Sequence, residues 1–146
     1  MATNPIIIPG NLNRVRVSAT FPSNSALNIG LGYFAKTQVH STLSDFAKSL
    51  PTQLGHVISE EPYSIAEFDF HVVRTLPLAN AWKAQWETSS ILGSMIVRPD
   101  TSVMSDFQLT SAMLKSASGL DFSGESAEII LKIVGIYYIN SDLFSL

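Results

Sequence analysis

The arrangement that comes nearest to reaction chemistry in this chain of 146 residues is one histidine close to two carboxylates. His71 follows Asp69 and Glu67 at spacings that place all three side chains on one side of an extended strand. An imidazole beside a carboxylate can bind a metal ion or transfer a proton. The same pattern is typical of a polar strand face that meets solvent, a lumen or a neighbouring subunit. We favour this second interpretation, because His40 and His56 add no metal-ligand spacing.

Other catalytic motifs are missing or incomplete. Gly30 and Gly32 lack the third glycine, the lysine and the following helix of a phosphate-binding loop. None of the serines lies in a nucleophile elbow. Glu60 and Glu61 precede Pro62, which is typical of a solvated turn. We therefore predict that the protein is not an enzyme and that it needs no cofactor and no metal ion.

Two tryptophans belong to the one segment with helical spacing. Leu78, Trp82 and Trp86 recur every four residues, Pro77 suits a first helical turn, and Gly93 can end the helix. The pattern predicts a helix over about residues 77–90. Indole rings can stack on a sugar or a base, but on an apolar helix stripe they more often pack in a core or an interface.

The composition points to association. Charged residues make up 14% of the chain, against roughly 25% in an average soluble domain. Ser and Thr supply 29 residues, so much of the polar surface carries hydroxyl groups rather than charge. A monomer with a Ser/Thr surface remains an alternative, but weak charge favours burial between subunits. The net charge of −3 without a Lys/Arg cluster argues against sequence-specific binding or wrapping of DNA.

The chain carries no cysteine, which excludes disulfides and thiolate metal sites and fits assembly in the cytosol. Its first ten residues lack the basic region and the long apolar core of a signal peptide. The longest apolar stretch, residues 129–139, is interrupted by Lys132 and is too short for a membrane span. We expect a soluble protein without membrane insertion.

Alternation with a period of two is the dominant pattern and predicts strands. In residues 64–74 the apolar side chains alternate with Glu67, Asp69 and His71, and residues 12–21 alternate in the same way. Further predicted strands cover residues 27–39, 53–59, 94–98, 107–117 and 127–140. The last of these is apolar on both faces, which indicates burial or a covering neighbour. Residues 42–50 fit either a helix or a strand–loop arm.

The predicted fold is mainly β. We expect a two-sheet β-sandwich or barrel-like domain with one flanking α-helix at about residues 77–90. Residues 1–146 would form a single domain with an N-terminal and a C-terminal arm.

Several segments, in order along the chain, resemble the major tail-tube proteins of contractile-tailed bacteriophages (myoviruses). The segments that carry the resemblance are Asn4-Pro5 to Pro9-Gly10, then Gly55-His56-Val57-Ile58-Ser59-Glu60-Glu61-Pro62-Tyr63, then Leu76-Pro77-Leu78-Ala79-Asn80-Ala81-Trp82 to Gly93, then Val97-Arg98-Pro99-Asp100, and finally Gly124-Glu125-Ser126-Ala127 with the strand through Asn140. The helix block and the last strand are the most specific. Residues 34–50 depart from the family pattern.

The resemblance implies a structural subunit that closes, six copies at a time, into rings. Rings would stack into a tube whose inner β-barrel is the channel for genome delivery, inside a contractile sheath. Residues 34–50 would contain an inter-ring arm. The implied partners are further copies of the chain, the tail sheath protein, and the tape-measure, baseplate and tail-terminator proteins. DNA would pass without sequence-specific binding. The implied location is the virion tail, assembled in the host cytoplasm.

Candidate interface residues come from the apolar ends and from the helix stripe. They are Ile6, Ile7, Ile8, Leu143, Phe144 and Leu146, followed by Trp82 and Trp86. Exposed apolar ends are costly unless they dock, which is the reason for choosing them. Glu67 and Asp69 are candidate lumen-facing acids that would repel DNA.

Other functions remain open. The chain could be the tube subunit of a phage-derived injection particle, or a tail-terminator or baseplate ring protein that forms one ring and stops. A remoter alternative is a small-ligand-binding β-barrel whose pocket is lined by Trp82, Trp86 and the His71 face. That alternative predicts a stable monomer.

Overall fold

The computed structural model describes residues 15–101, 104–119 and 127–145. The mainly β fold with one helix is confirmed. The strands are β1 Val17–Thr20, β2 Phe34–Leu43, β3 Ala47–Thr52, β4 Gly55–Glu60, β5 Tyr63–Val73, β6 Ile91–Pro99, β7 Phe107–Ser118 and β8 Glu128–Tyr138. The helices are α1 Leu76–Thr88 and the short 3₁₀ turns η1 Ser25–Leu27, η2 Leu31–Tyr33 and η3 Ser141–Ser145.

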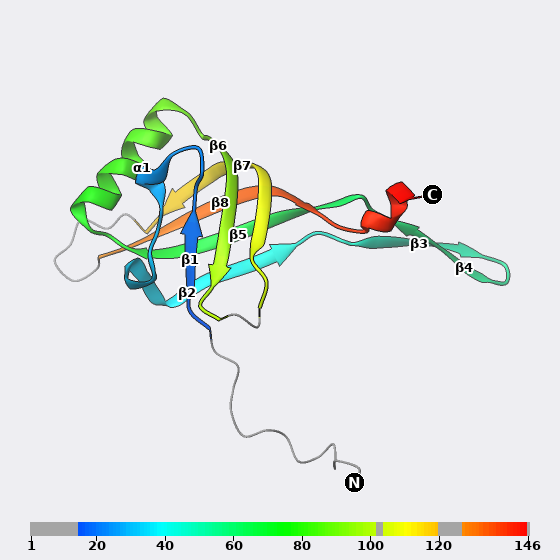
Figure 1. Ribbon diagram of the computed structural model, residues 1–146. Helices are drawn as coiled ribbons and strands as arrows, with labels where there is room; N and C mark the ends of the chain where they lie inside the picture. Colours follow the sequence, from blue (N-terminus) through cyan, green and yellow to red (C-terminus); the bar gives the residue numbers. More distant parts are fainter. Residues whose placement is uncertain (1–14, 102–103, 120–126, 146) are drawn as a thin grey trace, which may run out of the picture.

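Six strands form an antiparallel, nearly closed barrel-like sheet in the order β1-β6-β7-β8-β5-β2. β5 and β8 form its longest ladder, from Tyr63 opposite Tyr138 to Val73 opposite Glu128. Strands β3 and β4, which follow β2 and precede β5 in the sequence, form a separate two-stranded sheet. This hairpin extends away from the barrel, and α1 lies at the opposite end of the molecule (Figure 1). We call residues 47–60 the arm.

The core forms because alternate residues of each barrel strand point inward. On β5 the inward residues Ala66, Phe68, Phe70 and Val72 are all buried, as the alternation predicts. On β8 the odd-numbered residues from 129 to 133 are buried in the same way, and the even-numbered ones on the opposite face are half-buried. The barrel interior is therefore filled with side chains, and its outer β5–β8 face remains partly accessible.

Helix α1 closes one end of this core. Pro77 occupies its first turn, where a missing N–H costs nothing. The helix ends at Thr88, where the Ser89 N–H donates to the Gln85 carbonyl at 2.7 Å and the Gln85 side chain donates back to the Ser89 carbonyl at 2.9 Å. The prediction of Gly93 as the helix end is wrong. Gly93 lies inside β6 at a register shift, with φ of +80°, where a side chain would collide with Ser23 Oγ.

One predicted strand differs from the structure, and one segment that the sequence left open is now assigned. Residues 27–33 form no strand, because the Asn24 side chain accepts from the Ala26 N–H, and Asn28 Oδ1 accepts from the Phe21 N–H at 2.8 Å. These side chains give the backbone a turn in place of a ladder. Residues 42–50 are not helical: β2 ends at Leu43 and β3 starts at Ala47, so the strand–loop arm alternative is confirmed.

Within the described ranges, none of the helices has the length and apolar character needed to cross a membrane.

Residues 12–14 of the strand that was predicted over residues 12–21 lie outside the described residues. The observed strand begins at Val17.

Candidate assembly surfaces

The predicted polar face of β5 is present on the outer side of the barrel, where its acids are paired with lysines. Lys132 on β8, directly opposite Asp69, places its Nζ 3.2 Å from Glu67 Oε1 and 3.8 Å from Asp69 Oδ1. Lys115 on β7 lies 3.8 Å from the same Glu67 oxygen. About a third of each of the two acidic side chains is exposed. The two predicted lumen-facing acids are therefore accessible, but their charge is largely balanced by neighbours.

His71 also lies on this face, with a partner that the sequence did not indicate. Its Nδ1 is 2.6 Å from Glu128 Oε1, and the ring of His40 lies edge-on at 5.6 Å between centroids. Glu128 starts β8 and is opposite Val73, so it reaches His71 diagonally across the ladder. The β5–β8 register brings the pair together, and that register cannot be read from the spacing within one strand. Such a pair can share a proton, but it faces no nucleophile among the described contacts.

The described residues form neither a serine–histidine catalytic site nor a metal site. On the arm, Ser49 Oγ lies 2.6 Å from His56 Nδ1. In a Ser-His-Asp triad, the Ser bonds to the other ring nitrogen while Nδ1 is held by a carboxylate. Across the described ranges, His, Asp and Glu side chains form no group of three that could hold a metal ion.

The two tryptophans occupy different environments. Trp82 is 1% exposed and packs edge-on against Phe21, with 5.2 Å between ring centroids. Its side chain therefore belongs to the core and leaves no surface for a partner subunit. Trp86 is half-buried against the core and remains available at the surface.

The predicted terminal anchors can be placed only in part. Leu143 is half-buried in η3. Ile6, Ile7, Ile8 and Leu146, together with the side chain of Phe144, lie outside the described residues.

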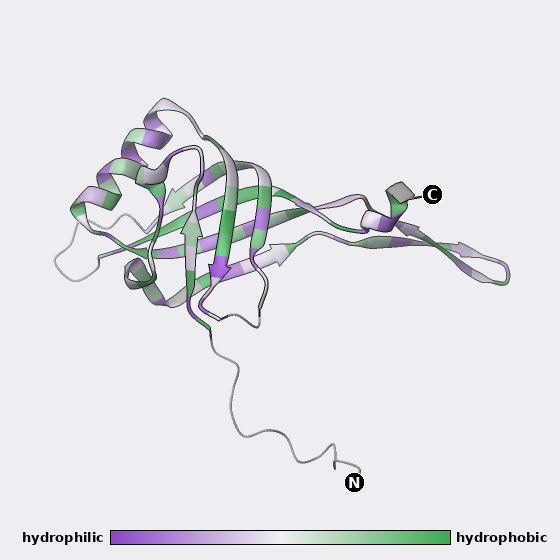
Figure 2. Cartoon of the chain, in the orientation of Figure 1, coloured by the Kyte–Doolittle hydropathy of each residue, from purple (hydrophilic) through white to green (hydrophobic). Residues whose placement is uncertain are grey.

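Among the described residues, the arm exposes the largest cluster of apolar side chains. Every residue of β3 and β4 is exposed. Leu50 and Val57, 64% and 54% exposed, are cross-strand partners on one face. Ile58 is paired with Ser49 on the other face, and Leu54 in the turn is fully exposed. Figure 2 shows hydrophobic stretches along this hairpin, beyond the reach of the barrel core. The sequence indicated a strand over residues 53–59 and an arm as one alternative for residues 42–50, but it did not indicate that this hairpin exposes its apolar side chains.

Hydrogen bonds at the base of the arm connect it firmly to the barrel. Asn140, just after β8, donates from Nδ2 to the Phe46 carbonyl at 2.9 Å and to the Glu61 carbonyl at 2.8 Å. On the barrel side, the buried Ser64 hydroxyl donates to the Ser44 carbonyl at 3.0 Å. Asn140 has a φ of +50°, a conformation that asparagine tolerates better than most residues. These bonds fix the direction in which the arm leaves the body.

Two strand edges of the barrel sheet remain open within the described ranges. β2 is the last strand of the sheet order, so one side of its ten residues has no ladder partner. The other end, β1, is covered by an isolated bridge between Ala19 and Ile29. β7 pairs with β6 only from Phe107 to Met113, which leaves residues 115–118 unpaired on that side. Open edges are templates for pairing with another chain.

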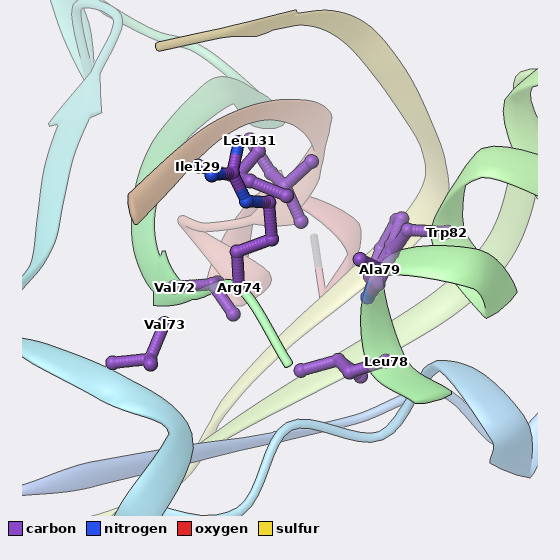
Figure 3. Close-up of a pocket in the computed structure, with 8 residues that line it drawn as sticks. All are labelled: Val72, Val73, Arg74, Leu78, Ala79, Trp82, Ile129 and Leu131. Atoms are coloured by element: carbon purple, nitrogen blue, oxygen red, sulfur yellow. The ribbon is translucent and has the colours of Figure 1, made fainter. Parts of the chain in front are cut away.

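A hollow of about 430 Å³ lies beside α1, at the end of the molecule opposite the arm. Its lining residues are Arg74, Leu76, Ala79, Asn80, Lys83, Trp86 and Ile129. We call it the α1 hollow. A smaller pocket of about 10 Å³, which shares Arg74, Ala79 and Ile129, lies between α1 and the β5–β8 ladder (Figure 3). Its volume is about that of one water molecule.

Comparison with known proteins adds no relative: no protein-family model matches the chain, and no curated protein matches it.

Proposed function

We propose that this chain is the tube subunit of a contractile phage tail and that its copies assemble into stacked rings. Strands from all copies of a ring would together form a larger inner β-barrel, which is the channel for genome delivery and is distinct from the filled barrel of one chain. The proposal rests mainly on one observation, which is that the arm exposes its apolar side chains to solvent. Six copies per ring, the sheath around the tube, and the tape-measure, baseplate and terminator partners come from the resemblance of the sequence segments to the tail-tube family.

The arm supports self-assembly because it is unfavourable in a free monomer. A two-stranded ribbon alone is marginally stable in water. Full burial of a Leu, Ile or Val side chain stabilises by about 1.5–3 kcal/mol, and the arm displays Leu50, Leu54, Val57 and Ile58 to solvent. Because apolar side chains lie on both faces of the ribbon, neighbouring subunits would have to cover it from both sides.

The open edges support lateral closure into rings. β2 and the second half of β7 are both part of the barrel sheet, so pairing between copies would continue that sheet from one subunit to the next. A contact between two different edges is head-to-tail, and such contacts close into a ring when the rotation fits. Ring closure removes the edges that would otherwise attract other chains.

The charge of the outer β5–β8 face supports its assignment as the wall of the channel. Its charged residues are Glu67, Asp69 and Glu128 against Lys115 and Lys132. Three acids and two lysines leave one net negative charge when the histidines are neutral. Tight binding to DNA requires several cations that release counterions from phosphates. A face of this composition would let DNA pass without adhering to it.

The ligand-binding alternative receives no support from the barrel interior. Phe21, Phe70 and Trp82 fill it, and the small pocket beneath α1 has the volume of about one water molecule. The alternatives of an injection-particle tube or a terminator or baseplate ring share the assembly features, and they differ in whether rings continue to stack.

The test is negative-stain electron microscopy of the purified chain over a range of concentrations, together with sedimentation velocity. We expect hollow rings or tubes of constant diameter that grow in number with concentration. A Leu50→Asp/Val57→Asp variant should stay monomeric with an unchanged far-UV circular dichroism spectrum. A wild-type protein that remains monomeric at all concentrations, also with sheath protein added, would refute the proposal, and single rings without stacks would favour the terminator alternative.

A further inference from the structure

We propose that the tip of the arm inserts into the α1 hollow of a second copy of this chain. The inference rests on the proposed self-assembly and names the surface that receives the arm. It concerns the hairpin turn at Leu54 and the hollow beside Leu76.

Shape and polarity make the two surfaces complementary. Leu54 is fully exposed at the convex end of the hairpin, and Leu76 is 79% exposed at the edge of a concave site. The hollow of about 430 Å³ exceeds the volume of one leucine side chain and is sufficient for the turn around it. Ala79 and Ile129 supply further apolar lining. Each of the two surfaces exposes apolar side chains to water that the other surface could bury.

Hydrogen-bonding groups also match. The turn between β3 and β4 contains two residues, Gln53 and Leu54, whose backbone carbonyls can accept hydrogen bonds. Lys83 and Arg74 at the hollow carry donors only, and Asn80 adds an amide that can donate. The carbonyls of the hairpin turn could therefore accept hydrogen bonds from the donors at the rim of the hollow.

The positions of the two surfaces set the mode of assembly. The arm and α1 lie at opposite ends of the molecule (Figure 1), so an arm cannot reach the hollow of its own chain. Insertion joins one copy to the next head-to-tail. A head-to-tail contact closes into a ring only when the rotation between copies fits, and otherwise it repeats along a line. Because the two surfaces lie at opposite ends of the molecule, we assign this contact to stacking rather than to ring closure.

The test uses the absence of cysteine from the natural chain, so that introduced thiols have no background. Leu54→Cys protein is mixed with Asn80→Cys protein under assembly conditions and oxidised. Thr88→Cys, exposed on the same helix two turns further along and outside the hollow, is the matched control. A disulfide requires Cα atoms about 4.4–6.8 Å apart, so we expect a heterodimer with Asn80→Cys and at most a trace with Thr88→Cys.

A second pair of variants measures the energetic role. Leu76→Asp and Ile91→Asp each place a carboxylate at an apolar side chain of matching exposure, 79% and 75%. Because an acid in the first turn of a helix is favourable, Leu76→Asp should fold normally. We expect it to raise the concentration needed for stacking by at least about tenfold, and Ile91→Asp to leave that concentration unchanged.

The outcomes separate this inference from the proposed function. Stacks that form normally from Leu76→Asp, or equal cross-linking at Asn80 and Thr88, would show that the arm docks elsewhere while self-assembly stands. A wild-type chain that never assembles would remove both.

Discussion

The barrel and the arm of this protein are built from the same kind of antiparallel ladder, yet they differ in what stabilises them. In the barrel, one face of each strand lies against the core, where residues such as Phe70 and Trp82 are almost completely buried. In the arm, every residue of both strands is exposed. Backbone pairing alone does not explain such a ribbon, because its hydrogen bonds replace equally available bonds to water. The barrel buries its own core within one chain, whereas the arm leaves its apolar side chains exposed.

The largest effect should come from breaking the barrel. Trp82→Ala removes the largest buried side chain and its edge-on contact with Phe21. We expect a loss of about 3–5 kcal/mol in the free energy of unfolding, measured by urea denaturation under conditions where the protein is monomeric. Trp86→Ala, at a half-buried position, should cost about 1 kcal/mol. Equal losses at the two positions would contradict the assignment of Trp82 to the core.

The next effect should appear in assembly while the fold is preserved. Leu50→Asp places a charge on the apolar face that Leu50 shares with Val57. We expect assembly to weaken by about 2–3 kcal/mol, roughly 30- to 150-fold in concentration, because the carboxylate would have to be desolvated in the interface. Unfolding of the monomer should change by less than about 0.5 kcal/mol. Leu50→Met is the conservative control and should assemble as the wild type does.

A smaller effect should follow when the arm is released at its base. Asn140→Gly keeps the φ of +50° but loses the two bonds to the Phe46 and Glu61 carbonyls. We expect a loss of about 1–2 kcal/mol, seen as faster proteolysis between residues 47 and 60 and as weaker assembly. Asn140→Asp, which cannot donate these bonds when ionised, should behave alike. Unchanged proteolysis in both variants would mean that the arm keeps its direction by other contacts.

The smallest effect on stability should come from the ion pairs of the outer β5–β8 face. Glu67→Gln with Asp69→Asn should change the free energy of unfolding by less than about 1 kcal/mol, because accessible ion pairs are screened by water. The same double variant converts the face from one net negative to one net positive charge. We expect weak, salt-dependent retention of assembled particles on DNA, absent in the wild type. Equal DNA retention in both proteins would argue against this face as the channel wall.

Much of the barrel could be predicted from the sequence, because burial on one side of a strand is recorded every second residue. The alternation in residues 64–74 identified the inward set from Ala66 to Val72, and the Trp82 stripe identified α1 to within two residues at either end. Where side chains bind the local backbone, alternation was misleading: Asn24 and Asn28 turn residues 27–33 away from the sheet.

The candidate site was predictable only in its polar half. Spacing placed Glu67, Asp69 and His71 on one face, but Lys132 and Glu128 reach them through the register between β5 and β8. Register depends on the sum of contacts along a whole ladder, which no local pattern contains. The arm was one of two alternatives for residues 42–50, since an exposed ribbon has no buried face to impose a period.

The sequence by itself determined that the protein is β-rich, sparsely charged, and free of a recognisable reaction centre, because composition and short-range periodicity are local properties. Only the tertiary structure decided that Trp82 serves the core, that β2 and the end of β7 are left as open edges, and that the arm and the α1 hollow lie at opposite ends. Those are relations between segments far apart in the chain, and they are fixed by which strands pair and in which register.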